Sequence, residues 1–364
     1  MKEDIQNSIQ KRLHNWLMRK APNSAVREVS DLSAVIGSDI GVARSDNQDR
    51  VAILRMAPSK DCFFAVAALC DGMGGMSEGS ICASQAIASF FMACIRNRHV
   101  LPTQRVIIAA QDANRHVHSL FNGRGGATLS AVLFDSIAGV AGVNVGDSRI
   151  YSYQGNKLEQ VTVDDTMAGL LKDNFNQSNE LLQYIGMGTG LEPHVIQLPA
   201  SFKSIIMTSD GAHFIDKQVM QMVVQASNNS ELTVRRLIEI AKWCGGNDNA
   251  SIISVSQLSL RSELPDDPGT IQVYDPFGEL QLIVFDIAGT GKTDNHPTPE
   301  KKTFQAEKPQ KSKESIKDVK KEKAIKKGKT TNKIVPKRKN AEVKETIPQL
   351  NIYFNGETGK DNNG

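Results

Sequence analysis

Short apolar runs and longer amphipathic stretches alternate through the middle of the chain, from about residue 33 to residue 258. Short apolar runs rich in β-branched residues predict strands at 51–56, 63–69, 128–134, 138–145, 149–153 and 204–208. Apolar residues at three- and four-residue steps predict helices at 80–96, 104–120 and 232–243. Because the helices are grouped and regular strand–helix–strand units are few, the pattern favours an α+β fold over a doubly wound sheet.

The first 20 residues have a helical pattern of their own. Their large apolar residues recur at helical spacing, which predicts a short amphipathic helix: Ile5, Ile9, Leu13, Trp16 and Leu17. We expect this helix to pack on the body; the alternative is a helix that binds a partner or a membrane surface. A polar connector follows, so residues 1–32 form an N-terminal helix and connector, and regular structure is expected to begin near Ser33.

The pattern changes again after Leu258. The turn-rich segment SELPDDPG is followed by two strand-like segments around DPFGE, which predict a small hairpin within residues 259–291. Residues 292–345 contain 18 Lys and Arg against 8 Asp and Glu and almost no aromatic residues, so we expect a disordered basic linker. An apolar segment and tail occupy 346–364. The net charge of +3 therefore combines an acidic body with a basic extension.

Composition and cysteine usage exclude several classes of protein. No apolar run approaches the roughly 20 residues of a membrane span, and the N-terminus lacks the continuous apolar core of a secretory signal. The five cysteines are odd in number and have no spacing typical of a metal site. Buried, reduced thiols are the simpler interpretation, which indicates a cytoplasmic protein.

Aspartates at the ends of predicted strands carry the chemical signal. Asp49 lies in GVARSDNQD, Asp71 in LCDGMGG, Asp210 in MTSDG and Asp248 in GGNDN. Carboxylates that converge repel one another unless divalent cations lie between them. Oxygen ligands alone select hard ions such as Mg²⁺ or Mn²⁺, and Gly72 would let a backbone carbonyl approach a metal closely. The sequence therefore predicts a metal site at these strand ends.

The sequence resembles a known family, the metal-dependent serine/threonine phosphatases of type 2C, in the compact version found in bacteria. The motifs that carry the resemblance occur in the family's order over residues 33–258: GVARSDNQD, ALCDGMGGMSEG, GGATLSAVLF, VNVGDSRIY, IMTSDG and GGNDNASII. The resemblance implies a four-layer sandwich, in which helices flank two antiparallel β-sheets. This agrees with the α+β pattern.

The resemblance also implies roles for individual residues. The first metal pair would be bound by Asp49, by Asp71 as the bridging ligand and by the Gly72 carbonyl. The remaining carboxylate ligands are implied at Asp210 and Asp248. Asp147 matches a position that helps to bind a third, weaker metal in bacterial members, and a purely structural loop aspartate is the alternative there. Arg44 matches the arginine that binds the substrate phosphate, a role for which its two parallel donors are suited.

The activity that the resemblance implies is hydrolysis of phosphoserine and phosphothreonine in proteins. Two Mn²⁺ or Mg²⁺ ions about 3.5–4 Å apart would lower the pKa of a bridging water, and the resulting hydroxide would attack phosphorus in line. A cognate kinase is the implied partner. On this basis we expect catalysis to need nothing after Leu258, and the C-terminal extension to be a candidate for binding a protein partner.

The sequence departs from the family pattern at several positions. Gln48 replaces a frequent glutamate, and Met73 stands where many members have a histidine proposed as general acid. His213 is a weak candidate to replace that acid, and Asp216 is the acidic residue nearest after Asp210. Residues 167–187 occupy the place of a mobile flap over the active site.

Three other interpretations stay open at this stage. One is a regulatory or scaffolding protein with a degenerate phosphatase body, against which the intact aspartates argue. A second is a nucleic-acid-tethering module that acts through the basic tail. The third is a nucleotide-binding loop at residues 285–293, which end in GKT; it is disfavoured because Asp286 stands where a glycine is needed and two prolines follow.

Overall fold

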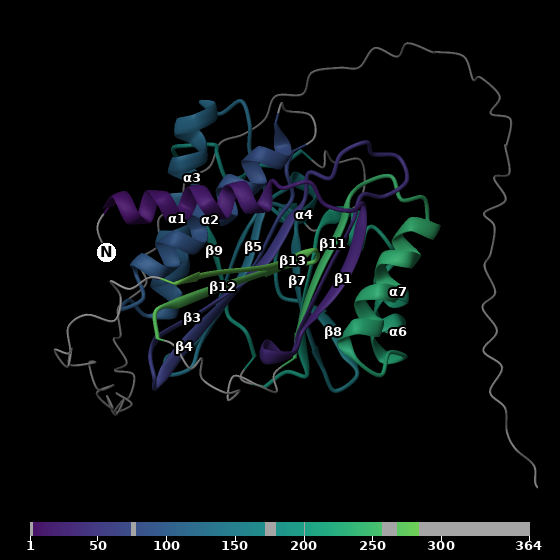
Figure 1. The fold of residues 1–364 in the computed structure, drawn as a ribbon. Coiled ribbons are helices and arrows are strands. Elements are labelled where there is room, and N and C mark those ends of the chain that lie inside the picture. The colour runs from purple at the N-terminus through teal and green to yellow at the C-terminus, as the bar shows by residue number, and fades with distance from the viewer. Residues whose placement is uncertain (1–2, 74–77, 172–179, 200, 257–267, 284–364) are drawn as a thin grey trace, which may run out of the picture. The chain divides into compact units, whose positions relative to one another are not determined.

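A computed structural model describes residues 3–73, 78–171, 180–199, 201–256 and 268–283 (Figure 1). The chain divides into two compact units, Met1–Asp294 and Asn295–Gly364, and every described residue belongs to the first. The predictions for 285–293, 292–345 and 346–364 therefore lie outside the described residues.

Two antiparallel sheets form the centre of the first unit. The six-stranded sheet has the order β1 (Ser24–Val29), β2 (Ala34–Asp39), β11 (Ala250–Ser256), β10 (Ser204–Thr208), β7 (Arg149–Gln154), β8 (Lys157–Gln160). The seven-stranded sheet has the order β13 (Gly278–Ile283), β12 (Thr270–Asp275), β3 (Arg50–Ser59), β4 (Cys62–Cys70), β5 (Leu129–Asp135), β6 (Gly139–Val145), β9 (His194–Ile196).

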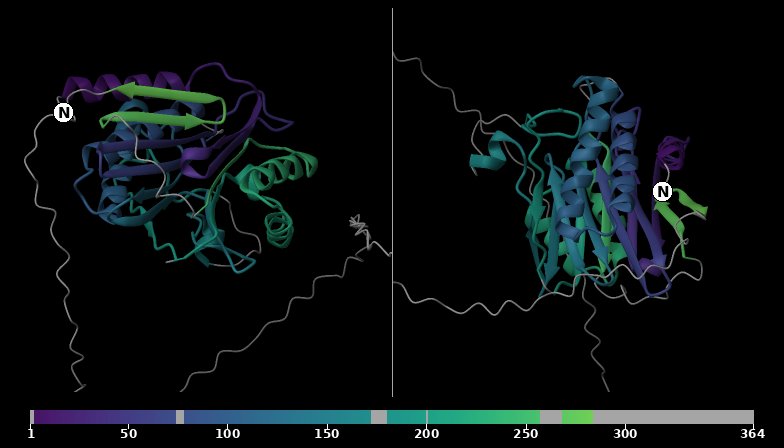
Figure 2. Two further views of the ribbon diagram at one scale, coloured as in Figure 1. Left: turned by 60° about the horizontal axis from the view of Figure 1, so that its bottom comes forward. Right: turned by 90° about the vertical axis from the view of Figure 1, so that its left-hand side faces the viewer.

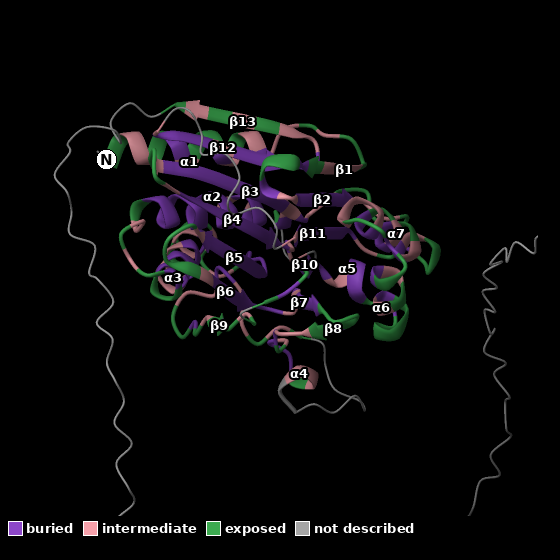
Figure 3. Ribbon diagram, turned by 90° about the horizontal axis from the view of Figure 1, so that it is seen from below, coloured by how far each residue is buried: buried purple, intermediate pink, exposed green. Residues whose placement is uncertain are grey.

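Strand β3 shows why the central strands are apolar without interruption. Side chains alternate between the two faces of a strand. Val51 and Ile53 enter the core between the two sheets, whereas Ala52, Leu54 and Met56 enter the core beneath the helices. Both faces of β3 are thus buried, and the central strands of the two sheets are the most buried part of the molecule (Figure 3).

Helices cover both outer faces (Figure 2). The seven-stranded sheet packs against α1 (Glu3–Leu17), α2 (Gly79–Arg96) and α3 (Pro102–Phe121). The six-stranded sheet packs against α5 (Asp210–His213), α6 (Lys217–Gln225) and α7 (Ser230–Trp243). The four-layer α+β prediction is therefore confirmed, as are the helices expected at 80–96, 104–120 and 232–243.

Two helices bear on the question of membrane contact. Among the described helices, α2 alone is long and apolar enough to span a bilayer, but 78% of it is buried inside the fold, as in a core helix. The apolar face of α1 is also buried, through Ile9, Leu13 and Leu17, in the core shared with α2 and α3. The expectation that the N-terminal helix packs on the body is confirmed.

The two segments beside the motif-bearing body are more regular and more integrated than the pattern predicts. Residues 24–29, predicted as connector, form β1, because they pair in register with β2 from Ser24–Asp39 to Val29–Ala34. The predicted hairpin exists as β12 and β13, but β12 also pairs with β3 and so widens the sheet. Ile271 and Val273 of β12 are fully buried.

The short elements α4 (Met167–Leu171) and a 3₁₀ turn (Ser30–Leu32) complete the described structure. The flap predicted at 167–187 is described only at 167–171 and 180–187. Strands β2, β4, β6 and β10 end, and β3, β7 and β11 begin, next to the predicted site residues. The antiparallel topology brings these termini to one end of the sandwich.

Candidate metal centre

Asp49 is the most enclosed carboxylate of the predicted set, since its residue is only 3% exposed. It directly precedes β3, and its Oδ2 accepts a hydrogen bond of 2.8 Å from the Ser209 hydroxyl. Its Oδ1 is buried and has no hydrogen-bond partner in the described part of the chain. Burial, together with the charges of Asp210 and Asp248, raises the pKa of Asp49 to about 7.

Asp71 and Asp210 line the same small cavity, and each carboxyl group influences the pKa of the other. Burial is the largest cause that raises the pKa of both groups. The neighbouring charge of Asp49 raises the pKa of Asp71 further, and that of Asp248 raises the pKa of Asp210. Asp210 Oδ1 is a second buried oxygen without a partner among the described residues. Two acidic groups in this position favour sharing one proton unless cations separate them.

Asp248 makes an ion pair with Arg44, in which Nη2 lies 2.6 Å from Oδ2. Both side chains are partly exposed, at 41% for the arginine and 34% for the aspartate. Asp248 Oδ1 accepts a hydrogen bond from the Asn249 N–H at 2.8 Å. The predicted phosphate-binding arginine thus lies at the predicted centre, where it neutralises one of its carboxylates.

Gly72 occupies a position where no side chain fits. A Cβ on this residue would lie 2.3 Å from the Gly79 carbonyl oxygen and 2.8 Å from that of Gln48. The Gly72 N–H donates to the Gln48 carbonyl at 3.2 Å. Gly72 therefore packs tightly against the backbone of Gln48 and Gly79, and it lines the same cavity as Asp71, Asp210 and Asp248, where a ligating carbonyl would be needed.

Asp147 lies in the turn between β6 and β7, and burial together with the charges of Asp210 and Asp164 raises its pKa to about 7. It lines two neighbouring cavities. One, of about 380 Å³, also includes Arg44, Asp71, Gly72, Asp210 and Asp248. The other, of about 690 Å³, extends from Asp147 and Asp210 towards Phe214 and α4. The cavities share Asp147, Asp210 and Asp248, so these carboxylates lie where the larger cavity meets the predicted metal site.

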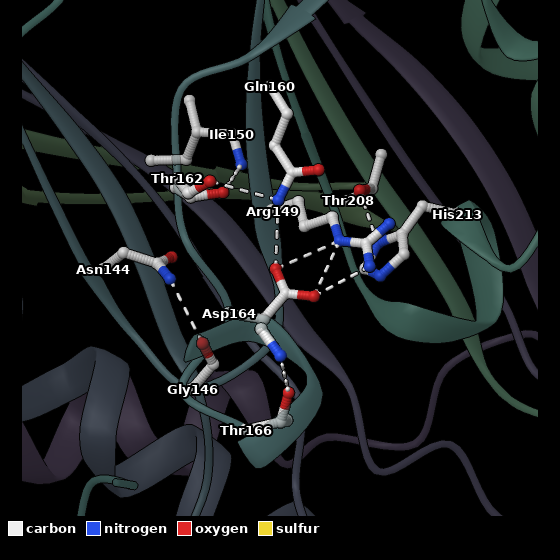
Figure 4. A network of polar contacts seen from close by, with 11 residues as sticks. Asn144, Gly146, Arg149, Ile150, Gln160, Thr162, Asp164, Thr166, Thr208 and His213 are labelled. Atoms are coloured by element: carbon white, nitrogen blue, oxygen red, sulfur yellow. Dashed lines mark hydrogen bonds and ion pairs between the residues drawn. The ribbon is translucent and has the colours of Figure 1, made fainter. Parts of the chain in front are cut away.

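An ion pair forms part of the wall of the larger cavity (Figure 4). Arg149 Nε lies 3.1 and 3.0 Å from the two carboxylate oxygens of Asp164, and its Nη2 lies 2.7 Å from Oδ2. Gln160 also donates to Asp164, at 3.1 Å. Arg149 is therefore held at several points by Asp164, whereas Arg44 is bound at one point and partly exposed.

Polar residues that motif reasoning did not assign to the site hold its loops in place. Asn249 accepts from the Gln48 N–H at 2.8 Å and donates to the carbonyls of Ile40 and Asp46 at 2.9 and 3.0 Å. Thr128 Oγ1 accepts from the Asp71 N–H at 2.9 Å. In the sequence, the one feature that could have indicated Asn249, Thr128 and Ser209 is that each lies in a motif or next to a predicted ligand.

Two of the weaker candidates have structural roles instead. His213 is 7% exposed, its Nδ1 lies 2.9 Å from Thr208 Oγ1, and burial beside Arg149 holds its pKa well below the usual value. It is therefore neutral at pH 7 and unsuited to act as a general acid. Asp216 caps α6 by accepting from the N–H groups of Gln218 and Val219 at 2.8 and 3.3 Å. Met73 lines the smaller cavity but has no proton to donate.

The donor set has the chemistry of a hard-cation site. In the part of the chain that the structure describes, no three His, Cys, Asp or Glu side chains are already arranged around one point that could hold a metal. Two buried, unpartnered carboxylate oxygens and several carboxyl groups with raised pKa values nevertheless lie together. Cations would satisfy these oxygens and offset the repulsion, so the residues fit Mn²⁺ or Mg²⁺.

Comparison with known proteins agrees with this geometry. No family model matches the chain. The serine/threonine phosphatase stp of Listeria welshimeri is 23% identical over 248 residues, which span 62% of this chain and 96% of that protein. The crystal structure of the Ser-Thr phosphatase MsPP from Mycobacterium smegmatis, in complex with cacodylate, superposes with a TM-score of 0.53 and 26% identity. The superposition covers 62% of this chain and 98% of MsPP.

The chain resembles the bacterial type 2C phosphatases in fold and motifs. The catalytic domain of the phosphatase PstP, solved with two manganese ions, matches with a TM-score of 0.51 and 25% identity, over 64% of this chain and 98% of that one. MsPP and the PstP catalytic domain are matched along almost their whole length, but by less than two thirds of this chain. The chain described here therefore has substantial segments beyond the part that it shares with them.

Proposed function

We propose that this chain hydrolyses phosphoserine and phosphothreonine in proteins at a centre of two Mn²⁺ or Mg²⁺ ions. One observation carries the proposal: among the described residues, the buried oxygens Asp49 Oδ1 and Asp210 Oδ1 have no hydrogen-bond partner, and they lie beside the carboxyl groups of Asp71 and Asp147, whose pKa values are also raised. A fold does not need this arrangement for stability, because each buried unpaired oxygen costs about 1–3 kcal/mol. The two manganese ions of PstP support the same interpretation.

The proposed ligands are Asp49, Asp71, the Gly72 carbonyl, Asp210 and Asp248, with Asp147 at a third, weaker site. When bound, the two ions neutralise the phosphate dianion and generate a nucleophile from water at neutral pH. The chain contributes the positions of the ligands, through Ser209, Thr128 and Asn249.

Arg44 is proposed to bind the phosphate of the substrate. In the described part of the chain its guanidinium is bound only to Asp248, and it is 41% exposed at the wall of the smaller cavity. Two parallel N–H donors match two phosphate oxygens. Cations on Asp248 would compete with the arginine for that carboxylate, which would release Arg44 towards the substrate.

The proposed setting follows from the cysteines and from the reaction. All five thiols are free, and burial raises the pKa of Cys94 to about 12, which makes that group inert. We propose a cytoplasmic enzyme that opposes a serine/threonine kinase, with its C-terminal extension available to a protein partner.

The test is phosphate release from a phosphothreonine peptide with Mn²⁺, comparing wild type with Asp210→Asn. Loss of one ligand charge should lower kcat by on the order of 10³-fold, since several kcal/mol of charge stabilisation is removed. Asp216→Asn is the matched control, because this neighbouring aspartate caps a helix and should leave turnover near wild type. Equal rates for Asp210→Asn would refute the assignment, and an inactive wild type would favour a regulatory protein with a degenerate body.

A further inference from the structure

Two segments outside the phosphatase motifs meet behind the loop that carries Asp49. Arg19, just after α1, makes a two-point ion pair with Asp275 in the hairpin, with Nη1–Oδ2 at 2.7 Å and Nη2–Oδ1 at 2.8 Å. Its Nη1 also donates to the Trp16 carbonyl at 2.7 Å, and the guanidinium stacks 4.0 Å from the Trp16 ring. We call this contact between the end of α1 and the β12–β13 turn the clamp.

The hairpin turn is shaped to fit this contact. Asp275 is 4% exposed, and its Oδ1 also accepts from the Phe277 N–H at 2.8 Å. Gly278 leaves room for the arginine, because a Cβ there would lie 3.1 Å from Arg19 Nη2. An ion pair with two parallel bonds and one buried partner is more specific than an exposed surface pair.

Arg50 connects the clamp to the candidate metal centre. Its Nη1 donates to the carbonyl oxygens of Asn47 and Asp49, both at 2.7 Å, and its Nη2 lies 3.5 Å from the Met18 sulfur next to α1. The charged groups around it are Asp46, Asp49, Asp275 and Arg19. One guanidinium therefore fixes the backbone on which Asp49 stands and contacts the N-terminal segment.

A cavity of about 340 Å³ joins the three parts, with Arg19, Arg50, Asp49 and Asp275 in its lining. Asp49 thus lines a cavity that it shares with the clamp, while its side chain accepts a hydrogen bond from Ser209. Displacement of the α1 end or of the hairpin turn would change the surroundings of Arg50, and with it the backbone of Asp49. A carboxylate ligand is sensitive to such a shift, because partners behind metal ligands commonly change metal affinity 10–100-fold.

We propose that Arg50 is a positioning residue for Asp49, and that the clamp holds Arg50 so that α1 and the β12–β13 hairpin set the metal affinity of the site. The proposal rests on the proposed metal-dependent function. It assigns a role to two segments that the family resemblance leaves unexplained.

The chain offers a matched control for the clamp. Arg27 of β1 also contacts the hairpin, with its Nη2 3.4 Å from Glu279 Oε2, and this pair is exposed. It joins an N-terminal element to the hairpin as Arg19 does, but it does not line the cavity beside Asp49. Arg27→Met therefore removes a charged contact between an N-terminal element and the hairpin, weaker than the clamp, without touching Arg50.

The experiment measures Mn²⁺ binding to the full-length protein, by the electron paramagnetic resonance signal of free Mn²⁺, with thermal unfolding in EDTA as a check of folding. Arg50→Met should weaken Mn²⁺ binding at least tenfold, Arg50→Lys less, and Arg19→Met about threefold or more, whereas Arg27→Met should stay within twofold of wild type. If Arg50→Met does not fold, Arg19→Met and Asp275→Asn carry the same comparison.

Two results would overturn the inference. One is wild-type Mn²⁺ affinity in folded Arg50→Met and Arg19→Met proteins. The other is equal weakening by Arg19→Met and Arg27→Met, which would indicate general loosening of the hairpin. A wild-type protein that binds no Mn²⁺ would remove the proposed metal centre itself, so the two failures are distinguishable.

Discussion

The loop between β2 and β3 has contrasting surroundings at its two ends. Near Asp248, carboxyl groups with raised pKa values crowd together, two of their oxygens have no partner among the described residues, and Arg44 is bound at one point. Near Arg50, the Nη donors of Arg19 and Arg50 meet carbonyl, carboxylate or sulfur acceptors, and Arg50 Nε is a buried donor without a partner in the described chain. The carboxylates of the first region need added cations to offset their charge, whereas almost all polar groups of the second region are satisfied by other groups of the protein.

This contrast distinguishes the residues that would bind a ligand from the residues that hold the site in place. Residues that are costly to bury without a ligand indicate what the protein binds, whereas residues that satisfy each other indicate how the site is held. Variants in the first region should change turnover and the response to metal. Variants in the second should change metal affinity and stability.

The largest expected effect is that of removing the β12–β13 hairpin by truncation. A chain that stops at Ser256 loses β12, whose Ile271 and Val273 are fully buried, and exposes the edge of β3. Each such residue contributes about 1.5–3 kcal/mol, a large share of a typical 5–15 kcal/mol. We expect this truncation to unfold or aggregate and a chain ending at Ile283 to keep wild-type unfolding and turnover, as measured by calorimetry and phosphate release.

This replaces the expectation from sequence that catalysis needs nothing after Leu258. The physical reason is that β12 pairs with β3 from Ile271–Met56 to Tyr274–Ile53 and contributes to the core beneath the helices. Equal stability of the two truncated chains would show that the hairpin is dispensable.

Arg44 provides the next test. Arg44→Ala should lower kcat/KM for a phosphothreonine peptide by about 10–100-fold, mainly through KM, because a two-point phosphate contact is lost. Arg44→Lys should restore little, since an ammonium cannot make the same two parallel bonds. Arg235→Ala, at an exposed arginine paired with Glu231 on α7, is the control. Unchanged KM in Arg44→Ala would remove this arginine from substrate binding.

The pH dependence of metal-free protein tests the crowded carboxylates. The folded pKa values of Asp49 and Asp147 are raised to about 7 from 3.8, so the fold favours their protonated forms. Stability in EDTA should therefore fall as pH rises from about 4 to 7 and then level off. We expect Tm to be on the order of 5 °C higher at pH 5 than at pH 7.5, and Asp49→Asn to flatten this slope.

Saturating Mn²⁺ should reverse the trend by stabilising the protein more at pH 7.5 than at pH 5, because the ligands must be deprotonated. A metal-free protein whose Tm rises between pH 5 and pH 7.5 would contradict the proposed crowding.

The smallest expected effect is at the helix cap beside the site. Asp216→Ala should lower the free energy of unfolding by about 1 kcal/mol, because two N–H groups at the start of α6 lose their acceptor. Turnover should be unchanged, and denaturant unfolding with a phosphatase assay checks both. A large loss of activity would place Asp216 in the chemistry after all.

The layers of the fold could be predicted because the central strands are buried on both faces and α2 and α3 have long periodic patterns. Strand β1 could not, because its sequence SAVREV lacks a regular alternation of polar and apolar residues and lies at a sheet edge, where pairing with β2 decides its structure. Helix α6 has only nine residues, and its clearest signal is the cap at Asp216.

At the site, the aspartates and Arg44 could be predicted because their motifs are local in sequence. The residues that hold them could not. Arg19 and Asp275 are separated by 256 positions, and Ser209 and Asp49 by 160, so only the tertiary fold brings them together. The roles of His213 and Asp216 also depended on burial and capping, which the motif alone does not reveal.

The central claim is that the crowded aspartates form a centre for two cations. The most direct measurement is anomalous scattering at the manganese edge from crystals of the full-length protein grown with MnCl₂. We predict two peaks about 3.5–4 Å apart between Asp49, Asp71, Asp210 and Asp248, with Asp71 touching both. Crystals with no peak among these residues, or with manganese only elsewhere on the protein, would contradict the account.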